Sequence, residues 1–240
     1  MAEGMPVHEG WASNGTGIIQ HKPKRVGTVA RPARNRTSMK WTLKQLVKRM
    51  QMGYQSRKAV REDSEGTHWL IQMRDLREDG TLRRESLTRF VPERVPEPYI
   101  VREGDVLFQV RGWNHWAGVV RGLDACTLAA NHFYILRLDT VRVLPEYLAW
   151  YINQSEAQRY FQKGAHGAGN VTVVPRAIFE NLEIPAPSLA VQEHIAALDR
   201  LQWREAELIQ QLQTKRTQWL RTVCLRAAKG RSGNKETDLS

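Results

Sequence analysis

One stretch decides the fold of this chain: residues 181–230 read NLEIPAPSLAVQEHIAALDRLQWREAELIQQLQTKRTQWLRTVCLRAAKG. Pro185 and Pro187 interrupt both a strand and a helix, and Ser188 is a suitable N-cap for the segment that follows. No Gly or Pro occurs from there to Gly230, and glycine commonly ends helices. The stretch therefore predicts a short strand, a proline hinge and one helix about 60 Å long.

The apolar residues of this predicted helix recur at alternating steps of three and four, which is typical of a helix that pairs with another helix. Glu205 and Lys215 interrupt the apolar positions with opposite charges. The helix can fold back on its own domain, or it can pair with an antiparallel partner. The charges favour a partner, because a buried charge must be paired. The expected dimerisation residues are Ile195, Leu198, Leu201, Glu205, Leu208, Leu212, Lys215 and Trp219.

Composition limits the class of protein and of partner. The chain has 240 residues, of which 41% are hydrophobic, so it can bury a real core. Its net charge of +11 favours a polyanionic partner, either nucleic acid or an acidic membrane surface. No segment has the length of a membrane span, and the first residues lack the apolar core of a signal peptide. Cys126 and Cys224 lie far apart, so we expect a cytoplasmic protein without disulfides or membrane partners.

Four segments are expected from the composition along the chain. Residues 1–39 form a basic arm without a fold of its own, which is either a passive extension or a phosphate-contacting arm. Residues 40–187 form a folded domain, 188–230 the long helix, and 231–240 a disordered tail. The irregular spacing of strands and helices within 40–187 does not fit repeated strand–helix–strand units. The sequence therefore predicts a mixed α+β domain followed by one long C-terminal helix that forms a coiled coil.

Within the domain, apolar periodicity predicts helices at 42–50, ending at Gly53, and at 144–163, ending at Gly164. Strands are expected at THWLIQMRDL, TLRRESLTRF and GDVLFQV, with turns at Gly80 and Gly104. The aromatic and aliphatic segment 113–139 supplies two or three more strands. A glycine-rich loop, a short helix and a last strand then lead to the long helix.

The sequence offers no recognisable catalytic constellation. It lacks an acidic residue two positions before a lysine, an Asn-Pro-Pro-aromatic tetrapeptide and a phosphate-binding Gly-Lys-Ser/Thr loop. The run GAHGAG is read as a flexible loop, because no acidic residue follows at the distance that a dinucleotide site requires. His115, His132 and His166 do not have the spacing of metal ligands. We expect a protein that is not an enzyme and that needs no cofactor or metal.

The loop that follows GDVLFQV is a candidate for contacts with DNA bases. Arg111 and Asn114 carry guanidinium and amide groups, which can bind guanine and adenine edges through two hydrogen bonds. Trp113 and Trp116 have two interpretations, as part of a binding loop or as core residues whose loop folds back. The expected DNA-binding residues of this segment are Gln109, Arg111, Trp113, Asn114 and His115.

Other polar loops are candidates for contacts with phosphates. Arg57 and Lys58 follow Gly53, and Arg74 lies at the end of an expected strand. In the glycine-rich loop, small residues permit close approach to a nucleic-acid backbone. The expected contacts in that loop are Lys163, His166 and Asn170.

The order of these segments resembles the target-recognition half of a type I restriction–modification specificity (S) subunit, over residues 41–230. The resemblance lies in the segment ending at Gly53, in LIQMRDL with its acidic glycine turn, and in EGDVLFQVRG, which is similar to the family's Gly-Asp, apolar strand, Arg-Gly pattern. It continues in LPEYLAWYINQS, the glycine-rich loop and LEIPAPSLAVQEHIAALD, which resembles the start of the family's conserved helix. Six segments in the family's order make the resemblance fairly specific.

Two departures qualify what the resemblance implies. Val191-Gln192 stands where the family usually has Glu-Gln, so any contact of that glutamate is in doubt. Family members commonly carry two recognition domains and two conserved helices, whereas this chain has one of each. The resemblance therefore implies a half subunit that homodimerises through its helix.

The resemblance also implies the partners. They are double-stranded DNA with a bipartite, interrupted palindromic site and an adenine methyltransferase (M) subunit, while a restriction (R) subunit with nuclease and translocase activity is an open alternative. A stand-alone DNA-binding regulator and a non-enzymatic scaffold of a phage-defence complex are the other two functions considered.

Overall fold

The computed structural model describes residues 40–93, 96–167 and 171–230. The expected basic arm, the expected tail and Asn170 lie outside the described residues. At the centre is an antiparallel sheet with the strand order β2-β9-β5-β7. Its strands are β2 (Val47–Met52), β9 (Phe133–Leu138), β5 (Val106–Gln109) and β7 (Ala117–Val119).

Strand β5 is buried on both faces of this sheet. Val106, Leu107 and Phe108 have exposed fractions of 0%. Because successive side chains point to opposite faces, Val106 and Phe108 belong to one core and Leu107 to another. The strand is therefore apolar throughout instead of alternating with polar residues.

Helices cover one face of the central sheet. They are α1 (Leu43–Leu46), α2 (Pro145–Asn153), α3 (Ser155–Gly164) and α4 (Arg176–Glu180). The ring of Phe108 stacks on Phe179 of α4 with the centroids 4.0 Å apart, and Phe161 of α3 lies 5.0 Å away. These aromatic contacts fix the helices over the middle of β5.

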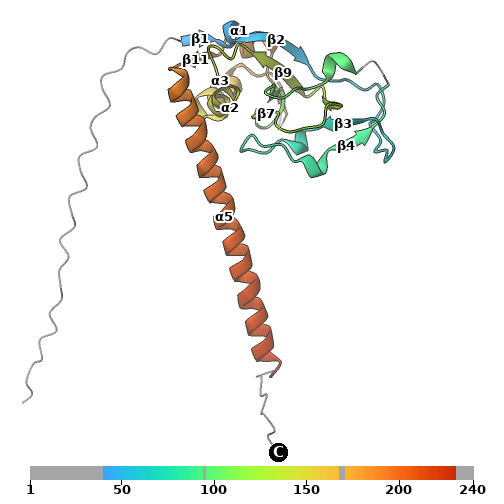
Figure 1. The fold of residues 1–240 in the computed structure, drawn as a ribbon, viewed down its shortest axis with the longest axis vertical. Coiled ribbons are helices and arrows are strands. Elements are labelled where there is room, and N and C mark those ends of the chain that lie inside the picture. Colours follow the sequence, from blue (N-terminus) through green and yellow to red (C-terminus); the bar gives the residue numbers. More distant parts are fainter. Residues whose placement is uncertain (1–39, 94–95, 168–170, 231–240) are drawn as a thin grey trace, which may run out of the picture. The chain divides into compact units, whose positions relative to one another are not determined.

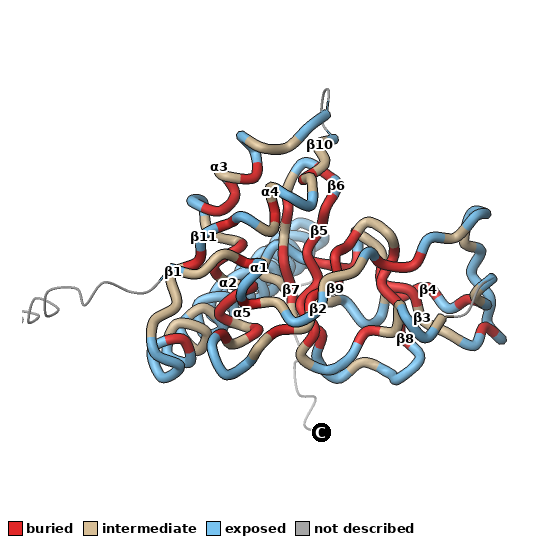
Figure 2. The backbone as a smooth tube through the Cα atoms, turned by 90° about the horizontal axis from the view of Figure 1, so that it is seen from above, coloured by how far each residue is buried: buried red, intermediate tan, exposed pale blue. Residues whose placement is uncertain are grey.

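A second sheet covers the opposite face (Figure 2). It has the strand order β4-β3-β8, with β4 (Thr88–Phe90), β3 (His68–Ile71) and β8 (Thr127–Ala129). Ile71 and Ala129 pack against Leu107 and Ile135 of the central sheet. Two short 3-10 helices, η1 (Met73–Asp75) and η2 (Arg84–Ser86), lie between β3 and β4, and a third, η3 (Glu97–Tyr99), lies between β4 and β5.

Two short strand pairs complete the described fold. Strand β1 (Lys40–Thr42) pairs with β11 (Glu183–Pro185), and β6 (Arg111–Gly112) pairs with β10 (Thr172–Val173). The ladder reaches Pro185, contrary to the expectation that this proline excludes pairing. Pro185 lies at the end of a two-stranded ladder, where a residue without an N–H is tolerated.

The structure confirms the long helix and most of the segments before it. Helix α5 spans Leu189–Ala228 with Ser188 at its N-cap, and Gly230 follows with φ +64°. Gly80 and Gly104 occupy the predicted turns, with φ +75° and +82°. The mixed α/β class with a long C-terminal helix is therefore as the sequence predicted.

The first predicted helix is wrong beyond one turn. Only Leu43–Leu46 is helical, and the chain then enters β2, which pairs with β9. Leu43 and Leu46 are buried, so the apolar periodicity correctly marks residues of the core. From residue 47 onwards, pairing of β2 with β9 outweighs the helical preference of the segment. The predicted helix 144–163 is two helices, because Gln154 is extended, with ψ 151°. The segment TLRRESLTRF forms a strand only at Thr88–Phe90.

A buried amide attaches α5 to the domain. Gln192 is 0% exposed, and its Oε1 accepts a hydrogen bond from the Leu144 N–H at 2.9 Å. Its Nε2 donates to the carbonyl oxygens of Arg142, at 3.0 Å, and Pro187, at 2.9 Å. The side chain therefore satisfies backbone groups before α2 and before α5 at once. At position 191 the family that the sequence resembles usually has glutamate, whereas this chain has Val191, which is 44% exposed.

Beyond this attachment, α5 leaves the domain (Figure 1). Ile195 still packs against the core that contains α2, but the side chains are exposed from residue 200 onwards. No helix in the described ranges is long and apolar enough to cross a membrane.

The buried amide leads to a stability prediction. Replacing Gln192 by glutamate keeps its shape but places a carboxylate against two carbonyl oxygens that lose their donor. We expect the free energy of unfolding to fall by at least about 1–3 kcal/mol. Urea denaturation measures it, with Gln213→Glu on the exposed part of α5 as the matched control. Equal stability of the two variants would contradict this role of Gln192.

Candidate nucleic-acid interface

The loop after β5 is held in a defined shape by its own backbone and by Gln109. Gly112 has φ +140°, and a Cβ atom built there would lie 2.6 Å from Nε2 of Gln109. That nitrogen donates to the carbonyl oxygen of Arg111 at 3.0 Å. The Arg111 side chain and Trp113, which is 67% exposed, therefore project from a constrained turn. Gln109 itself is only 7% exposed and supports the loop from inside.

His115 is buried beneath this loop. It has an exposed fraction of 0%, with Nδ1 3.0 Å from the Gln109 carbonyl oxygen and Nε2 3.0 Å from Oγ1 of Thr172. The amide of Gln158 accepts from the His115 N–H at 3.4 Å and donates to its carbonyl oxygen at 2.9 Å. The expectation that His115 contacts DNA directly is corrected here, because its ring nitrogens are both occupied inside the protein.

The structure brings together the predicted base-contacting loop and the predicted glycine-rich loop. Strand β6 pairs with β10, so that Arg111 lies opposite Val173 and Gly112 opposite Thr172. Oγ1 of Thr172 lies 3.0 Å from the Gly112 carbonyl oxygen. The backbone of His166 exchanges hydrogen bonds with Val173 at 3.0 and 2.8 Å. Figure 2 shows β6 and β10 side by side at one end of the central sheet.

The exposed side chains of these paired loops form one surface. We call it the reading surface, and its described members are Arg111, Trp113, Asn114 and His166 of the two loops and Lys163 in the last turn of α3. Asn114 is half-buried and the other four are exposed. Trp116 instead packs against the core between the two sheets, so the two interpretations of the tryptophans divide: Trp113 is a surface residue and Trp116 a core residue.

The other predicted contacts lie on the second sheet and its loops. Arg57 and Lys58 are exposed on the connection after β2, where the Arg57 N–H donates to Glu93 at 3.2 Å. Arg74 is exposed on η1 and donates to Oγ1 of Thr88 at 2.9 Å. Arg74 follows Met73, whose Cε lies 3.4 Å from a Cβ atom built at Gly112, so η1 lies against the loop after β5.

An open groove adds basic residues, of which the sequence singled out only Lys215. It lies between the loop after η1 and α5, and Trp113 and Asn114 line it too. The cations along it are Arg77, Arg83, Arg84, Arg121, Arg200, Arg204 and Lys215. The paired arginines after the Gly80 turn were visible in the sequence, but their position opposite the helix depends on the fold.

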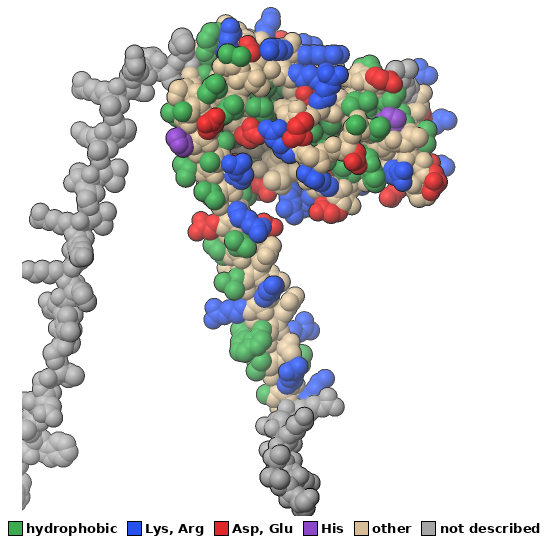
Figure 3. Space-filling view, viewed as in Figure 1, with side chains coloured by type: hydrophobic (Ala, Val, Ile, Leu, Met, Phe, Trp, Pro, Cys, Tyr) green, Lys and Arg blue, Asp and Glu red, His purple; other side chains and the backbone are tan. Residues whose placement is uncertain are grey.

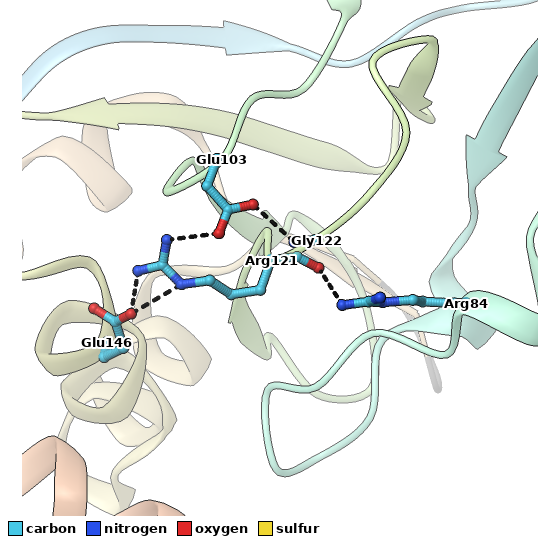
Figure 4. A network of polar contacts seen from close by, with 5 residues as sticks. All are labelled: Arg84, Glu103, Arg121, Gly122 and Glu146. Atoms are coloured by element: carbon cyan, nitrogen blue, oxygen red, sulfur yellow. Dashed lines mark hydrogen bonds and ion pairs between the residues drawn. The ribbon is translucent and has the colours of Figure 1, made fainter.

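Not every cation of the groove is free to bind an anion. Arg121 is ion-paired with Glu146 and, at 3.1 Å, with Glu103 (Figure 4). The Gly122 N–H and the Arg121 guanidinium hold the pKa of the Glu103 carboxyl below its usual range. Arg84 donates to the Arg121 carbonyl oxygen at 2.9 Å. Arg121 is thus a structural tie between α2 and the turn before β5, whereas Arg77, Arg83 and Arg84 have no ion pair with described residues.

Helix α5 exposes an apolar stripe. Leu198 is 67% exposed, Leu212 68% and Trp219 64%. The predicted polar positions Glu205 and Lys215 are exposed along the same helix, whereas Ile195 belongs to the domain core. Figure 3 shows hydrophobic patches between Lys and Arg side chains along α5. We call Leu198, Leu201, Leu208, Leu212 and Trp219 the exposed stripe.

Metal and disulfide chemistry find no support in the described part of the chain. No group of three or more His, Cys, Asp or Glu side chains there could hold a metal ion. Cys126 and Cys224 are both free and exposed.

The sequence matches no family model and no curated protein. Solved structures of type I restriction–modification proteins do match. The HsdS subunit from Thermoanaerobacter tengcongensis is 16% identical with a TM-score of 0.54, over 84% of this chain and 51% of that chain. A chain from a study of complex assembly and conformational transition of the type I R-M system is 16% identical with a TM-score of 0.54, over 83% and 46%. The S subunit from M. genitalium is 18% identical with a TM-score of 0.45, over 68% and 39%.

These comparisons establish the fold. The chain spans about half the length of the HsdS subunit from Thermoanaerobacter tengcongensis, and it folds like that half. The resemblance derived from the order of sequence segments is therefore confirmed at the level of structure.

The buried histidine predicts a pH dependence of stability. Burial lowers the pKa of His115 below its ordinary value of 6.5, although the Gln109 carbonyl partly opposes this. The unfolded chain then binds a proton that the folded chain resists, so the free energy of unfolding falls as the pH drops from about 7 to 5. In a His115→Gln variant this loss should be smaller. Denaturation at several pH values measures the free energy of unfolding. Subtracting the pH profile of the variant from that of the parent chain removes the contribution of His132, whose pKa is also lowered. Identical pH profiles would contradict the assignment.

Proposed function

We propose that this chain is the DNA-recognition subunit of a type I-like restriction–modification or related phage-defence system, and that it directs an adenine methyltransferase to a bipartite DNA site. The observation that carries the proposal is the reading surface, which projects from the central sheet of a domain folded like half of an HsdS subunit. A net charge of +11 supplies the attraction to a polyanion. The chain itself performs no catalysis in this proposal.

Arg111 is proposed as a base reader and Arg57 and Lys58 as phosphate contacts. Arg111 lies on a turn held by Gln109 and by the β6–β10 pair, so the backbone position from which its side chain extends is fixed. Reading a base edge requires such fixed geometry, because two hydrogen bonds must form together. Arg57 and Lys58 lie on an exposed loop, where a charge can follow the phosphate backbone without a fixed geometry.

The exposed stripe is proposed to pair with the stripe of a second copy. Leucine and tryptophan side chains that are about two-thirds exposed along one helix favour burial against a partner. The solved HsdS chain is about twice as long as the matched region, so two copies of this chain supply an equal number of domains. Two identical domains related by a two-fold axis present the same reading surface twice, and the target is then an interrupted palindrome.

The methyltransferase subunit is the proposed catalytic partner. A restriction subunit with nuclease and translocase activity is a further proposed component. Both follow from the type I R-M systems to which the matched structures belong.

The proposed function predicts two separable effects on DNA binding. Selection from random duplexes with the full chain should recover an interrupted palindrome. Arg111→Ala should weaken binding to that site by about 1–3 kcal/mol and change binding to a scrambled duplex little. The double variant Arg57→Ala, Lys58→Ala should weaken binding to the selected site and to the scrambled duplex equally. It should also reduce the salt dependence of DNA binding.

Arg226→Ala serves as the control. It removes one positive charge at the end of α5, which is neither the proposed base reader nor one of the proposed phosphate contacts. An equal loss on selected and scrambled duplexes for Arg111→Ala would overturn its role as a reader. Recovery of a single undivided motif would argue against the two-copy arrangement.

Pairing through the exposed stripe predicts a change of oligomeric state. Replacing Leu201, Leu208 and Leu212 by glutamine should leave the domain folded and make the chain monomeric at micromolar concentrations, since each buried leucine contributes about 1.5–3 kcal/mol. Light scattering measures the mass, and circular dichroism checks the fold. A Gln210→Ala, Gln218→Ala variant, on the side of α5 that lines the groove, should stay dimeric. A triple variant of unchanged mass would exclude this interface.

A further inference from the structure

A small cavity of about 220 Å³ lies where α5 passes the domain, and tryptophans from separate elements surround it. Trp116 comes from the β5–β7 connection, Trp150 from α2 and Trp203 from α5. The sequence analysis assigned no role to Trp150 or Trp203. Three indole rings line one cavity, and the faces of aromatic rings carry partial negative charge.

The polar groups of this cavity have the opposite character to the rest of the chain. Asp199 and Glu78 line it, and no lysine or arginine does, although the chain has a net charge of +11. Asp199 has no ion pair with any described residue. Its partial burial raises the pKa of its carboxyl above the ordinary value, a hydrogen bond from the Trp203 side chain opposes this, and the nearby Asp79 adds a smaller rise. A carboxylate in such surroundings is stabilised by a cation.

Asn153 and Gln154 line the cavity, and of the two only Gln154 adds an acceptor. Asn153 is committed to the backbone of Ala117, accepting from its N–H at 2.8 Å and donating to its carbonyl oxygen at 2.9 Å. Gln154 donates its Nε2 to the Trp150 carbonyl oxygen at 2.8 Å, which leaves its side-chain oxygen as an acceptor. The cavity therefore offers aromatic faces and acceptors to whatever enters it.

We propose that this cavity binds the guanidinium group of an arginine side chain. A guanidinium is planar, stacks on indole faces and donates several hydrogen bonds in a fixed fork, which fits the tryptophans together with Asp199 and Gln154. A phosphate or nucleic-acid backbone is repelled by the carboxylates. A bare metal ion leaves the aromatic faces unused.

Occupation of the cavity also links α5 to the domain a second time. Asp199 and Trp203 lie about two and three helical turns beyond Gln192, the existing attachment. An arginine held between them and Trp150 of α2 therefore fixes the direction of the helix. This proposal does not depend on DNA binding.

The test uses the full chain and NMR signals of the tryptophan indole N–H groups, assigned by single Trp→Phe variants. N-acetyl-arginine amide should shift the signals of Trp116, Trp150 and Trp203 in a saturable way. The neutral isostere N-acetyl-citrulline amide should not, because it lacks the charge that the carboxylates and rings attract. Asp199→Asn should weaken arginine binding about tenfold or more.

A matched variant separates the cavity from general charge effects. Glu193→Gln removes a carboxylate from an exposed position on the same helix, outside the cavity, and should leave the affinity unchanged. Thermal unfolding confirms that each variant is folded. Equal shifts from arginine and citrulline, shifts confined to the exposed Trp113 and Trp219, or equal binding by Asp199→Asn and the parent chain would each overturn the proposal.

Discussion

The three hydrogen bonds of the Gln192 amide are the interaction on which the rest of the structure depends. One side chain satisfies backbone groups at Leu144, Arg142 and Pro187, and so joins the start of α2 to the start of α5. Tyr147 reinforces the joint, since its hydroxyl donates to the Pro185 carbonyl oxygen at 2.5 Å. An amide provides two N–H donors and an acceptor oxygen, which matches these three backbone partners. The direction in which the helix leaves the domain is therefore set by a few polar contacts and not by a large apolar interface.

A second constraint, the doubly buried strand β5, fixes the other functional part. Its side chains fill the cores on both faces of the sheet, so the strand cannot shift without disturbing both. Hydrogen bonds of Gln109 and the buried His115 connect the following loop to this strand and hold the loop in place. Because His115 also contacts Thr172, the two loops of the reading surface are held by one polar cluster. A surface that is fixed before it meets its ligand loses less entropy on binding.

The sequence predicted the parts of this structure whose signals are local. The long helix was visible from its uninterrupted periodicity, and the turns at Gly80 and Gly104 from residues that tolerate positive φ. The helix expected at 42–50 failed because strand β2 is created by pairing with β9, more than 80 residues away in the chain. His115 was misjudged for the same reason, since its partner Thr172 is distant in sequence. The groove cations depend on the placement of α5 against the domain, which no local pattern encodes.

The order of the elements along the chain has a consequence for biosynthesis. Strand β11 completes the domain by pairing with β1, and the Leu43 N–H donates to the Leu182 carbonyl oxygen at 2.9 Å, so the domain cannot close until residue 185 has left the ribosome. The exposed stripe follows directly, and a ribosome adds roughly 5–20 residues per second. The exposed stripe is thus synthesised after the domain, within seconds of domain closure. The stripe therefore becomes accessible only after the residues that complete the domain have been synthesised.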